Sequence, residues 1–598
     1  MAIISADEAK SDYDVVIVGS GAGGGQAAFT LTLAGFKCCM LEAGRSYDPI
    51  TETPMFNGPG QAPLMGNATR EKGFGFYDAT VGGGWEVPGE PYTSVQEKAD
   101  EKFKWWRPRM LGGRTNHWGR IALRNGPYDF KPRSRDGLGF DWPISYEDVE
   151  PYYTKVEMLI GVYGTNEGME NTPNSPPGVL LPAPKARAAE LFAQKHSPKV
   201  GVPIISIHRA VLTRTLDFKT IPAKLYPGNK WAQRIVGQAM GSRGACFWAT
   251  ECGRGCSAMA NYQSTTVHLP PALATGNLDL IPDAHAREVV VKGGKATGVV
   301  FIDKTTGKER RVNGKAVIVA AGACESVRLL LNSKSHAFPN GLANSSGLIG
   351  KYIMDTVGAG LGGHVPAMEN LPPHNADGAG GDHLYSPWWL YKQQKAGKLD
   401  FARGYHIELG GSREMPGGYN PVPEDLTRGS YGTRFKEDAR RYYDAFMYFA
   451  SRGEMIPNEN CYADLDPTVK DKFGLQVLRF HWKWSSHELN QAAHAEKTFG
   501  ELMTAMGGTV RGPANPKPGW SLKRPGEIIH EVGGAIIGAD PKKSVCNSFN
   551  QTWDVKNLLL CDGAPFASNA DKNPTLTIMA LSWRACDHLV DEMKKGNL

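Results

Sequence analysis

Residues 14–24 read Asp14-Val-Val-Ile-Val-Gly19-Ser-Gly21-Ala-Gly23-Gly24. The apolar run predicts a buried parallel strand, and the segment from Gly21 to Leu33 predicts the helix that follows it. The glycine spacing has a mechanical meaning: Gly19 turns the chain tightly, Gly21 lets the backbone approach a pyrophosphate, and Gly24 lets the helix pack closely. The stretch therefore predicts an α/β fold that binds a dinucleotide.

The next apolar run, residues 37–42, predicts a second strand that ends in Glu42. An acid at this place is expected to accept hydrogen bonds from ribose hydroxyls. An ordinary glycine-rich turn would not need a strand, a helix and a terminal acid in register. Residues 46–92 are rich in Gly, Pro, Asn and Thr and show little periodicity, so we expect a long loop that covers the cofactor.

Composition narrows the class of protein. The chain has 598 residues, of which 41% are hydrophobic, and its 71 glycines and 40 prolines indicate many shaped loops. A net charge of +6 without a dense Lys/Arg run argues against nucleic acid as a partner. No run approaches the ~20 apolar residues that cross a bilayer. Residues 1–8 lack a signal-peptide pattern, so we expect folding in the cytoplasm and export only through another protein.

Three of the ten cysteines, Cys246, Cys252 and Cys256, lie within eleven residues in a C-x5-C-x3-C spacing. Thiolates this close in a glycine-containing loop suit a soft metal, and iron–sulfur clusters are commonly held by cysteine. Three ligands fit a three-iron cluster, or a four-iron cluster with an outside ligand, whereas zinc sites usually have four. The residues alone also allow a disulfide with a spare thiol, or buried cysteines without a ligand.

The order of these features resembles the glucose–methanol–choline (GMC) family of flavin oxidoreductases over essentially the whole chain. The resemblance implies a Rossmann-like FAD-binding domain braided with a mixed-sheet substrate domain, an α/β architecture. The matching positions are Gly19, Gly21, Gly24, Glu42, Gly112, Gly113, His117, Trp118, 317–322, 347–355, 530–534, Asp562, Gly563, Asn573 and Pro574.

Within that family, the cysteine loop looks like that of the flavin subunits of bacterial dehydrogenases that oxidise gluconate, fructose, glucose or position 3 of glucosides. The resemblance implies that Cys246, Cys252 and Cys256 hold a 3Fe-4S cluster, which passes electrons to a cytochrome c or a quinone. It also implies a small companion subunit with a twin-arginine signal, export of the folded pair to the periplasm, and membrane contact only through partners. Without a companion the chain is expected to stay in the cytoplasm.

The resemblance assigns the chemistry to His530 and Asn573. A neutral imidazole is a suitable base for an alcohol proton, and the Asn573 amide can both donate to and accept from the same hydroxyl. Asp562, Gly563 and Gly113 match positions near the flavin.

His117 has two interpretations. It matches the place where pyranose oxidases attach flavin covalently, and the alternative is a histidine that packs against the ring without a bond. The aromatic pairs Trp388-Trp389 and Tyr405-His406 offer a stacking face for a sugar, although core packing explains them equally well.

We therefore predict an FAD-dependent dehydrogenase that oxidises a secondary or anomeric hydroxyl of a sugar or glycoside, with C3 of glucosides as the first choice. The alternatives are a gluconate, fructose or glucose dehydrogenase subunit, an oxygen-using oxidase without a cluster, and a flavoprotein that only transfers electrons. The expected divisions are 1–140, 266–355 and 525–598 for FAD, 141–245 for cap elements, 246–265 for the cluster loop and 356–524 for substrate.

Overall fold

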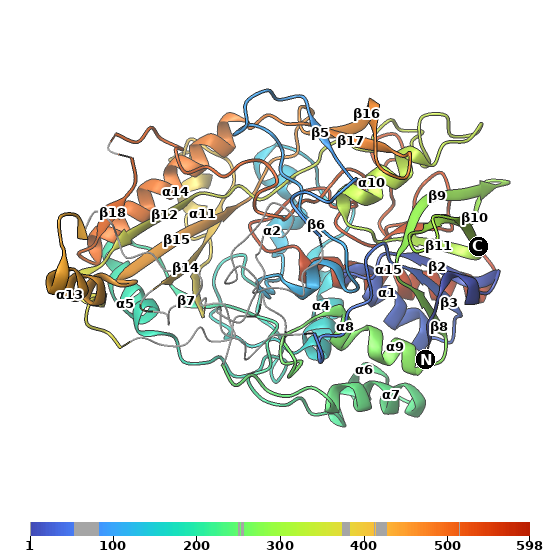
Figure 1. The fold of residues 1–598 in the computed structure, drawn as a ribbon, viewed down its shortest axis with the longest axis horizontal. Coiled ribbons are helices and arrows are strands. Elements are labelled where there is room, and N and C mark those ends of the chain that lie inside the picture. Colours follow the sequence, from blue (N-terminus) through green and yellow to red (C-terminus); the bar gives the residue numbers. More distant parts are fainter. Residues whose placement is uncertain are drawn as a thin grey trace.

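The computed structural model describes residues 2–52, 83–248, 252, 256–372, 383–411, 413, 427–513 and 515–598. Most of the loop predicted to cover the cofactor, residues 53–82, lies outside this part. Two large sheets dominate the described residues and lie at opposite sides of the molecule in Figure 1.

The larger sheet has eight strands, and its parallel half is built from the apolar runs of the sequence. The strand order is β1-β8-β3-β2-β11-β10-β9, and β19 pairs in parallel with β11. Strand β3 is buried throughout, as expected of parallel strands covered on both faces. Strands β9, β10 and β11 form an antiparallel ladder. The bounds are β1 Ala2–Ile3, β2 Asp12–Val18, β3 Cys38–Leu41, β8 Leu278–Ile281, β9 Ala284–Lys292, β10 Lys295–Asp303, β11 Glu309–Val319 and β19 Leu558–Leu560.

Helix α1 (Ala22–Leu33) follows β2 directly, and its residues from Gly23 onward are all buried. It packs against α15 (Thr575–Lys595), which also contacts α4 (Tyr146–Ile160). Helix α4 begins after Ser145, whose backbone N–H donates to Asp148 over 2.8 Å. Two helices from opposite ends of the chain are thereby joined over this sheet (Figure 1).

Strand β2 lies between β3 and β11, so the sheet order reverses beside it. Ligands of open α/β sheets bind at such a point, outside the carboxyl ends of the strands. Gly19 ends β2 with a φ of +97°, a backbone conformation that favours glycine. A Cβ on Gly24 would lie 1.9 Å from the Gly19 carbonyl oxygen, so the close packing predicted for Gly24 is what the fold requires.

The second sheet has six antiparallel strands in the order β18-β12-β15-β14-β13-β7, and α14 packs against it. Strands β14 and β15 are its central pair. The bounds are β7 Ile205–Ser206, β12 Gly360–His364, β13 Leu384–Ser386, β14 Tyr405–Gly411, β15 Phe446–Gly453, β18 Thr509–Arg511 and α14 Ser486–Ala505.

Shorter elements complete the described chain. Strands β16 and β17 form a small sheet with β5, and β4 pairs with β6. Their bounds are β4 Gly83–Gly84, β5 Thr93–Ser94, β6 Arg107–Pro108, β16 Tyr462–Lys470 and β17 Gln476–His481. The other helices are α2 Pro127–Phe130, α3 Pro132–Asp136, α5 Ala188–His196, α6 Thr220–Leu225, α7 Lys230–Gly241, α8 Ser264–Val267, α9 Leu269–Ala274, α10 Ala323–Asn332, α11 Tyr391–Lys395 and α13 Gly432–Tyr442.

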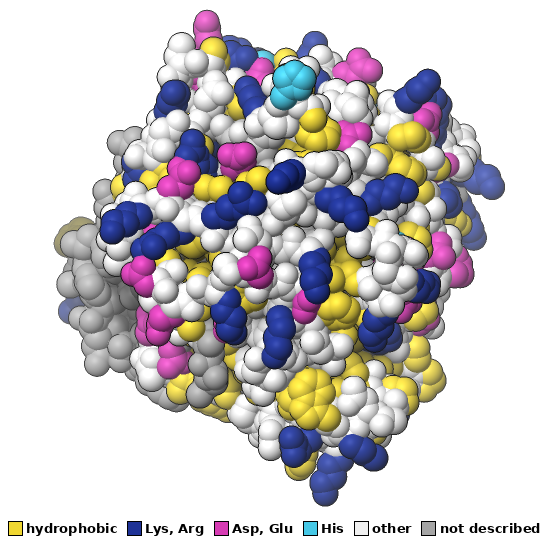
Figure 2. Space-filling model, turned by 90° about the vertical axis from the view of Figure 1, so that its right-hand side faces the viewer, with side chains coloured by type: hydrophobic (Ala, Val, Ile, Leu, Met, Phe, Trp, Pro, Cys, Tyr) yellow, Lys and Arg dark blue, Asp and Glu magenta, His cyan; other side chains and the backbone are white. Residues whose placement is uncertain are grey.

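The predicted mixed α/β class is confirmed by this architecture. The larger sheet takes strands from both ends and the middle of the chain, as a braided domain requires, while the six predicted boundaries themselves stay predictions. Figure 2 shows the face at the eight-stranded end, where Lys and Arg side chains are spread out with acidic side chains among them. Within the described residues, no helix combines the length and the apolar character needed to cross a membrane.

Candidate active site

One cavity of about 480 Å³ lies where the strand ends of the large sheet face the second sheet. Its volume is in the range of small-molecule sites. It is lined by the ends of β2, β3, β11 and β19, by the turn 113–119, and by residues of β14 and β15. Nine of the ten residues predicted to be catalytic or to bind the cofactor line it: Gly19, Gly21, Glu42, Gly113, His117, His530, Asp562, Gly563 and Asn573.

Bare backbone forms one wall of the cavity. A Cβ on Gly21 would meet no atom within 4 Å, and a Cβ on Gly113 would approach only the Gly21 Cα, at 3.6 Å. The two glycines therefore lie close together, and Gly21 borders open space that a side chain would fill. This cradle fits the pyrophosphate of a dinucleotide, next to the first turn of α1, whose N–H groups attract anions. Gly24 does not line the cavity and serves the packing described above.

Glu42 lies where the ribose-binding acid was predicted. Its carboxylate accepts from the Gly44 N–H over 2.6 Å, from the Ser20 N–H over 3.1 Å and from the Ser20 hydroxyl. Burial raises the pKa of this carboxyl, while the same hydrogen bonds oppose the rise. Each carboxylate oxygen can accept more than one hydrogen bond, so acceptor capacity for ribose hydroxyls remains.

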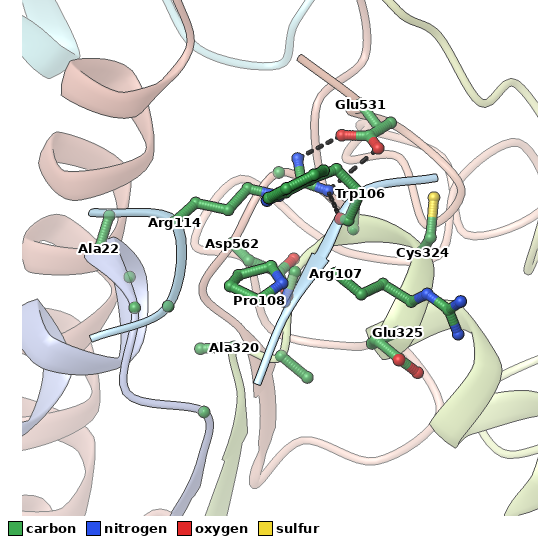
Figure 3. Close-up of a pocket in the computed structure, with 18 of the residues that line it drawn as sticks. Ala22, Trp106, Arg107, Pro108, Arg114, Ala320, Cys324, Glu325, Glu531 and Asp562 are labelled. Carbon is green, nitrogen blue, oxygen red and sulfur yellow. Dashed lines mark hydrogen bonds and ion pairs between the residues drawn. The ribbon is translucent and has the colours of Figure 1, made fainter. Parts of the chain in front are cut away.

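Asp562 lines the cavity (Figure 3) and joins the ends of β11 and β19. Its carboxylate accepts from the Gly322 N–H over 3.0 Å, the Ala564 N–H over 2.8 Å and the Ser326 hydroxyl. Burial raises the pKa of Asp562. The carboxylate fixes the start of α10 against the turn after β19, so Asp562 shapes the cavity.

His530 and Asn573 meet in the cavity from segments far apart in the chain. The Asn573 amide nitrogen lies 3.4 Å from His530 Nε2, and His530 Nδ1 lies 3.0 Å from the Thr356 hydroxyl. With Nδ1–H donating to Thr356, the Nε2 lone pair is the acceptor that a base needs. Burial lowers the pKa of His530 to about 3, and Arg452 adds to the effect. The Asn573 Oδ1 atom is buried without a partner among the described residues.

The backbone around His530 is held under strain that the sequence did not reveal. Ile529 has a φ of +66°, which a β-branched residue rarely adopts. Its carbonyl accepts from Arg114 over 3.0 Å, and Arg114 also forms an ion pair with Glu531 (Figure 3). Asp355 accepts from the His530 N–H over 3.0 Å. Arg114 thus ties the turn 113–119 to the residues on both sides of the histidine.

Two further charged residues of the cavity, Glu408 on β14 and Arg452 on β15, were missed by the sequence analysis. They form an ion pair of 2.6 Å. Burial acts to raise the pKa of Glu408, but Arg452 and His406 outweigh it and lower the pKa to about 2. Tyr448 of β15 also lines the cavity. No local motif marks these residues, because antiparallel pairing of two strands brings them together.

The aromatic residues considered as stacking faces for a sugar make other contacts in the structure. His406 Nε2 lies 3.3 Å from Glu408, and its Nδ1 contacts the Asp571 carbonyl, so it supports the cavity from behind. Trp388 is buried against Phe401 and Tyr405, as the core-packing interpretation expects.

Comparisons with known proteins agree with this geometry. Family models described as GMC oxidoreductase match residues 231–365 and 457–582. The chain belongs to the GMC oxidoreductases. Members of this family bind FAD, and the chain is an oxidoreductase for CH–OH groups of alcohols or sugars. The predicted family, fold class and enzyme class are confirmed.

Two relatives match almost the whole of this GMC oxidoreductase. A 2-methyl-1,2-propanediol dehydrogenase from Mycolicibacterium austroafricanum is 29% identical over 96% of this chain and 95% of its own. The fructose dehydrogenase large subunit of Gluconobacter japonicus is 27% identical over 98% of both chains. Among solved structures, pyridoxine 4-oxidase from Mesorbium loti aligns with a TM-score of 0.62 at 13% identity, covering 96% of this chain and 98% of that one. That likeness supports the fold alone.

His117 of this GMC oxidoreductase lines the cavity beside Trp118. Its Nε2 accepts a hydrogen bond of 2.8 Å from the indole N–H of Trp106. Burial lowers the pKa of His117 to about 3, so the ring is neutral. A covalent flavin bond at Nε2 would break the contact with Trp106, whereas a bond at Nδ1 would preserve it.

The buried acids Asp129, Glu454 and Asp571 hold three carboxylate oxygens within 4.8 Å of one another, a spacing that could suit a metal ion. Lys572 lies among them, however, with its ammonium 3.0 Å from Asp129 and 2.5 Å from Asp571. This lysine already supplies the positive charge. The network fixes the segment that carries Asn573, one residue further on.

Cys252 is linked to the wall of the cavity. Its carbonyl accepts from the Asn261 amide over 3.3 Å, and the carbonyl of the next residue, Tyr262, accepts from Trp118, which lines the cavity. No disulfide links two cysteines in the described part of the chain, which contains all ten of them. Backbone N–H groups of Trp248 and Ala260 donate to the sulfurs of Cys246 and Cys256, each over 3.4 Å. Burial raises the pKa of Cys252, and Arg120 and Arg209 oppose the rise. Backbone N–H···S bonds and nearby cations are what thiolate ligands of a cluster need.

Proposed function

We propose that this GMC oxidoreductase is an FAD-dependent dehydrogenase that oxidises a secondary or anomeric hydroxyl of a sugar or glycoside, with C3 of glucosides as the first choice. The observation that carries the proposal is the group of polar side chains around the base. His530 Nε2 and the Asn573 Oδ1 atom, which has no partner in the described part of the chain, share the cavity with the ion pair of Glu408 and Arg452.

The roles follow from the donors and acceptors. The Asn573 amide holds the substrate hydroxyl, and the neutral His530 imidazole removes its proton through Nε2 as the carbon loses hydride. Thr356 fixes the tautomer from the other side of the ring. Gly21 and Gly113 would hold FAD, which would supply the hydride acceptor. The imidazolium that forms is stabilised by the carboxylate of Glu408, which acts electrostatically on His530.

The substrate class is inferred from Glu408 and Arg452, the charged pair that shares the cavity with His530. A carboxylate and a guanidinium on adjacent strands offer acceptors and donors to several hydroxyls at fixed spacing, as a pyranose needs. Tyr448 adds an aromatic face for a sugar ring. An alkanediol, as in the name of the Mycolicibacterium relative, would leave the charged pair largely unused. The charged pair therefore favours a sugar as the substrate.

For the electrons we propose a 3Fe-4S cluster held by Cys246, Cys252 and Cys256, with a cytochrome c or a quinone as the final acceptor. The N–H···S bonds support this assignment. The Gluconobacter relative is by name the large subunit of its enzyme, which supports a companion subunit here. We propose export of the folded pair to the periplasm by that companion.

Product analysis tests the proposal most directly. Purified protein is incubated anaerobically with an artificial acceptor and methyl glucoside, glucose, gluconate, fructose or 2-methyl-1,2-propanediol, and products are assigned by NMR. We expect a 3-keto glucoside. A product from gluconate or fructose would point to the alternative subunit types, and turnover of the diol alone would reject a sugar substrate. Peroxide formed in air by iron-free protein would support the oxygen-using oxidase.

The covalent flavin bond and the export with a companion subunit are tested by separate measurements. Acid precipitation separates free from covalent flavin, and a bond through Nδ1 of His117 is the form that keeps the Trp106 contact. Cell fractionation tests the location, after the chain is co-expressed with a signal-bearing subunit encoded by a neighbouring gene. Activity found only in the cytoplasm would reject export.

A further inference from the structure

We infer that Arg120 is a positioning residue for the metal centre at the cysteine loop, because its buried guanidinium provides the positive charge that an anionic centre needs. The inference rests on the proposed cluster and deepens it. Arg120 is fully buried. Within the described residues, which omit 249–251 and 253–255, it forms no ion pair with a carboxylate.

The contacts of Arg120 are to neutral groups. Its guanidinium donates to the carbonyl of Trp118, to that of Asn116 over 2.8 Å and to that of Thr115 over 3.3 Å. Its Nε atom is buried without a partner among the described residues. The backbone of Arg120 itself has a φ of +60°, an uncommon conformation for a side chain of this size. The fold therefore maintains both strain and a buried charge at this position.

Two more buried arginines stand near the same thiols. Arg209 donates to the Gly119 carbonyl and acts electrostatically on Cys252. Arg243 donates to the Met259 carbonyl over 3.1 Å, and the thiol of Cys256 acts on it. The backbone also places Arg120 near this loop, because its carbonyl accepts from the Ala210 N–H over 2.8 Å, and the Leu212 carbonyl, two residues on, accepts from the Cys246 N–H over 2.7 Å. Three cations from distant parts of the sequence thus gather around two of the proposed ligands.

A buried cation such as that of Arg120 destabilises a protein unless an anion lies beside it. Carbonyl dipoles solvate a guanidinium but do not neutralise it. Three thiolates around an iron–sulfur core carry the opposite charge, so the centre and the arginines stabilise each other. One-electron reduction makes the centre more negative, and a fixed cation then favours the reduced form and raises the reduction potential.

Arg120 also connects the centre to the flavin cavity. The carbonyls that it binds belong to the turn 113–119, and Thr115, His117 and Trp118 of this turn line the cavity. One guanidinium therefore holds the wall between the two proposed redox sites. An arginine that merely tied this turn together would leave the potential of the centre unchanged when a neutral hydrogen-bond donor replaced it.

The test compares Arg120→Gln, which keeps N–H donors but loses the charge, with Arg120→Lys, which keeps the charge. Arg403→Gln is the matched control, because Arg403 is as deeply buried but pairs with Asp136 over 3.0 Å, away from the cysteines. Iron content, a dithionite titration followed by electron spin resonance, and thermal unfolding with and without iron are measured on the full chain.

We expect about three irons per flavin in the wild type. In Arg120→Gln the equilibrium constant for reducing the centre should fall about tenfold or more, which is about 59 mV for one electron. Arg120→Lys and Arg403→Gln should stay near the wild type. Arg120→Gln should also lower the melting temperature of the iron-loaded protein, because the centre loses its cation. It should not lower the melting temperature of the iron-free protein, because Arg120 has no anion to compensate it there.

Loss of iron from Arg120→Gln with retention in Arg120→Lys and Arg403→Gln supports the inference equally. An unchanged potential in an iron-loaded Arg120→Gln protein overturns it while the cluster proposal stands. An equal shift in Arg403→Gln overturns it as well. A wild-type protein without iron would reject both the cluster and the role of Arg120.

Discussion

His530 Nε2 lies 3.4 Å from the amide nitrogen of Asn573, although 43 positions separate them in the chain. Each is held by its own support. His530 is fixed by Asp355, Thr356 and the strained Ile529. Asn573 is fixed by the buried ion pair that the preceding residue, Lys572, forms with Asp129. The site is therefore rigid before substrate arrives, as pre-organised catalysis requires.

The first prediction concerns the base. His530→Ala should slow flavin reduction by sugar roughly 10²–10⁴-fold, the usual loss for a positioned general base. Sugar binding should weaken much less, because the base acts mainly in the transition state. Asn573→Ala should cost less than the histidine change, since the proton acceptor stays. Stopped-flow bleaching gives both quantities, and a His530→Ala protein within about tenfold of wild type would mean that another group is the base.

The second prediction is a pH profile. The sequence alone places the acid limb of flavin reduction near the ordinary histidine pKa of about 6.5. Burial, helped by Arg452, lowers the pKa of His530 to about 3. The imidazole therefore stays neutral and able to accept a proton at pH values well below the ordinary histidine pKa. The rate should therefore be nearly constant from about pH 8 to about pH 5. An acid limb at the ordinary pKa would contradict the geometry.

Arg452→Met provides the matched test of that profile. Removing a cation that acts on His530 raises the histidine pKa, so the acid limb should move to higher pH. Rates are compared at saturating sugar, because Arg452 is also proposed to bind the substrate. Lys497→Met, a change at an exposed lysine of α14, should leave the profile in place.

The third prediction separates two glycines of one motif. Gly21→Ala adds a methyl that meets no protein atom within 4 Å, so the protein should fold normally and bind FAD more weakly. Gly24→Ala forces a Cβ to within 1.9 Å of the Gly19 carbonyl and should destabilise the fold by about 1–3 kcal/mol. Flavin content and the free energy of unfolding of the flavin-free proteins distinguish the two. Equal loss of stability in both variants would show that Gly21 is a packing residue.

The sequence predicts local features of this protein well and long-range ones poorly. The strand from Asp14 and the helix after Gly21 follow from patterns within a few residues. The residues around the FAD cavity followed from the resemblance to a family. Glu408 and Arg452 did not, because their meeting depends on the register of two strands about forty residues apart.

The sequence also does not predict which charged side chains are buried. Nothing local indicates that Arg114 pairs with Glu531, or that Lys572 lies among Asp129, Glu454 and Asp571. Such pairs form between segments that only the complete fold brings together, and an arginine in sequence is ordinarily expected at the surface. The same holds for Arg120, which the cysteine spacing alone does not reveal.

The last prediction follows from Lys572, whose ammonium neutralises part of that acidic group. Lys572→Met leaves buried carboxylates without their cation and should destabilise the protein by about 3–5 kcal/mol, the usual cost of breaking a buried ion pair from one side. Because Asn573 is the next residue, kcat should fall as well. Lys572→Arg keeps the charge and should recover part of both losses. Asp129→Asn combined with Lys572→Met removes one charge of each sign and should recover stability but not kcat, since the position of Asn573 depends on the ion pair itself. Urea unfolding and steady-state kinetics measure the two effects separately. A Lys572→Met protein as stable as the wild type would show that the acids are protonated in the fold and that the network is not ionic.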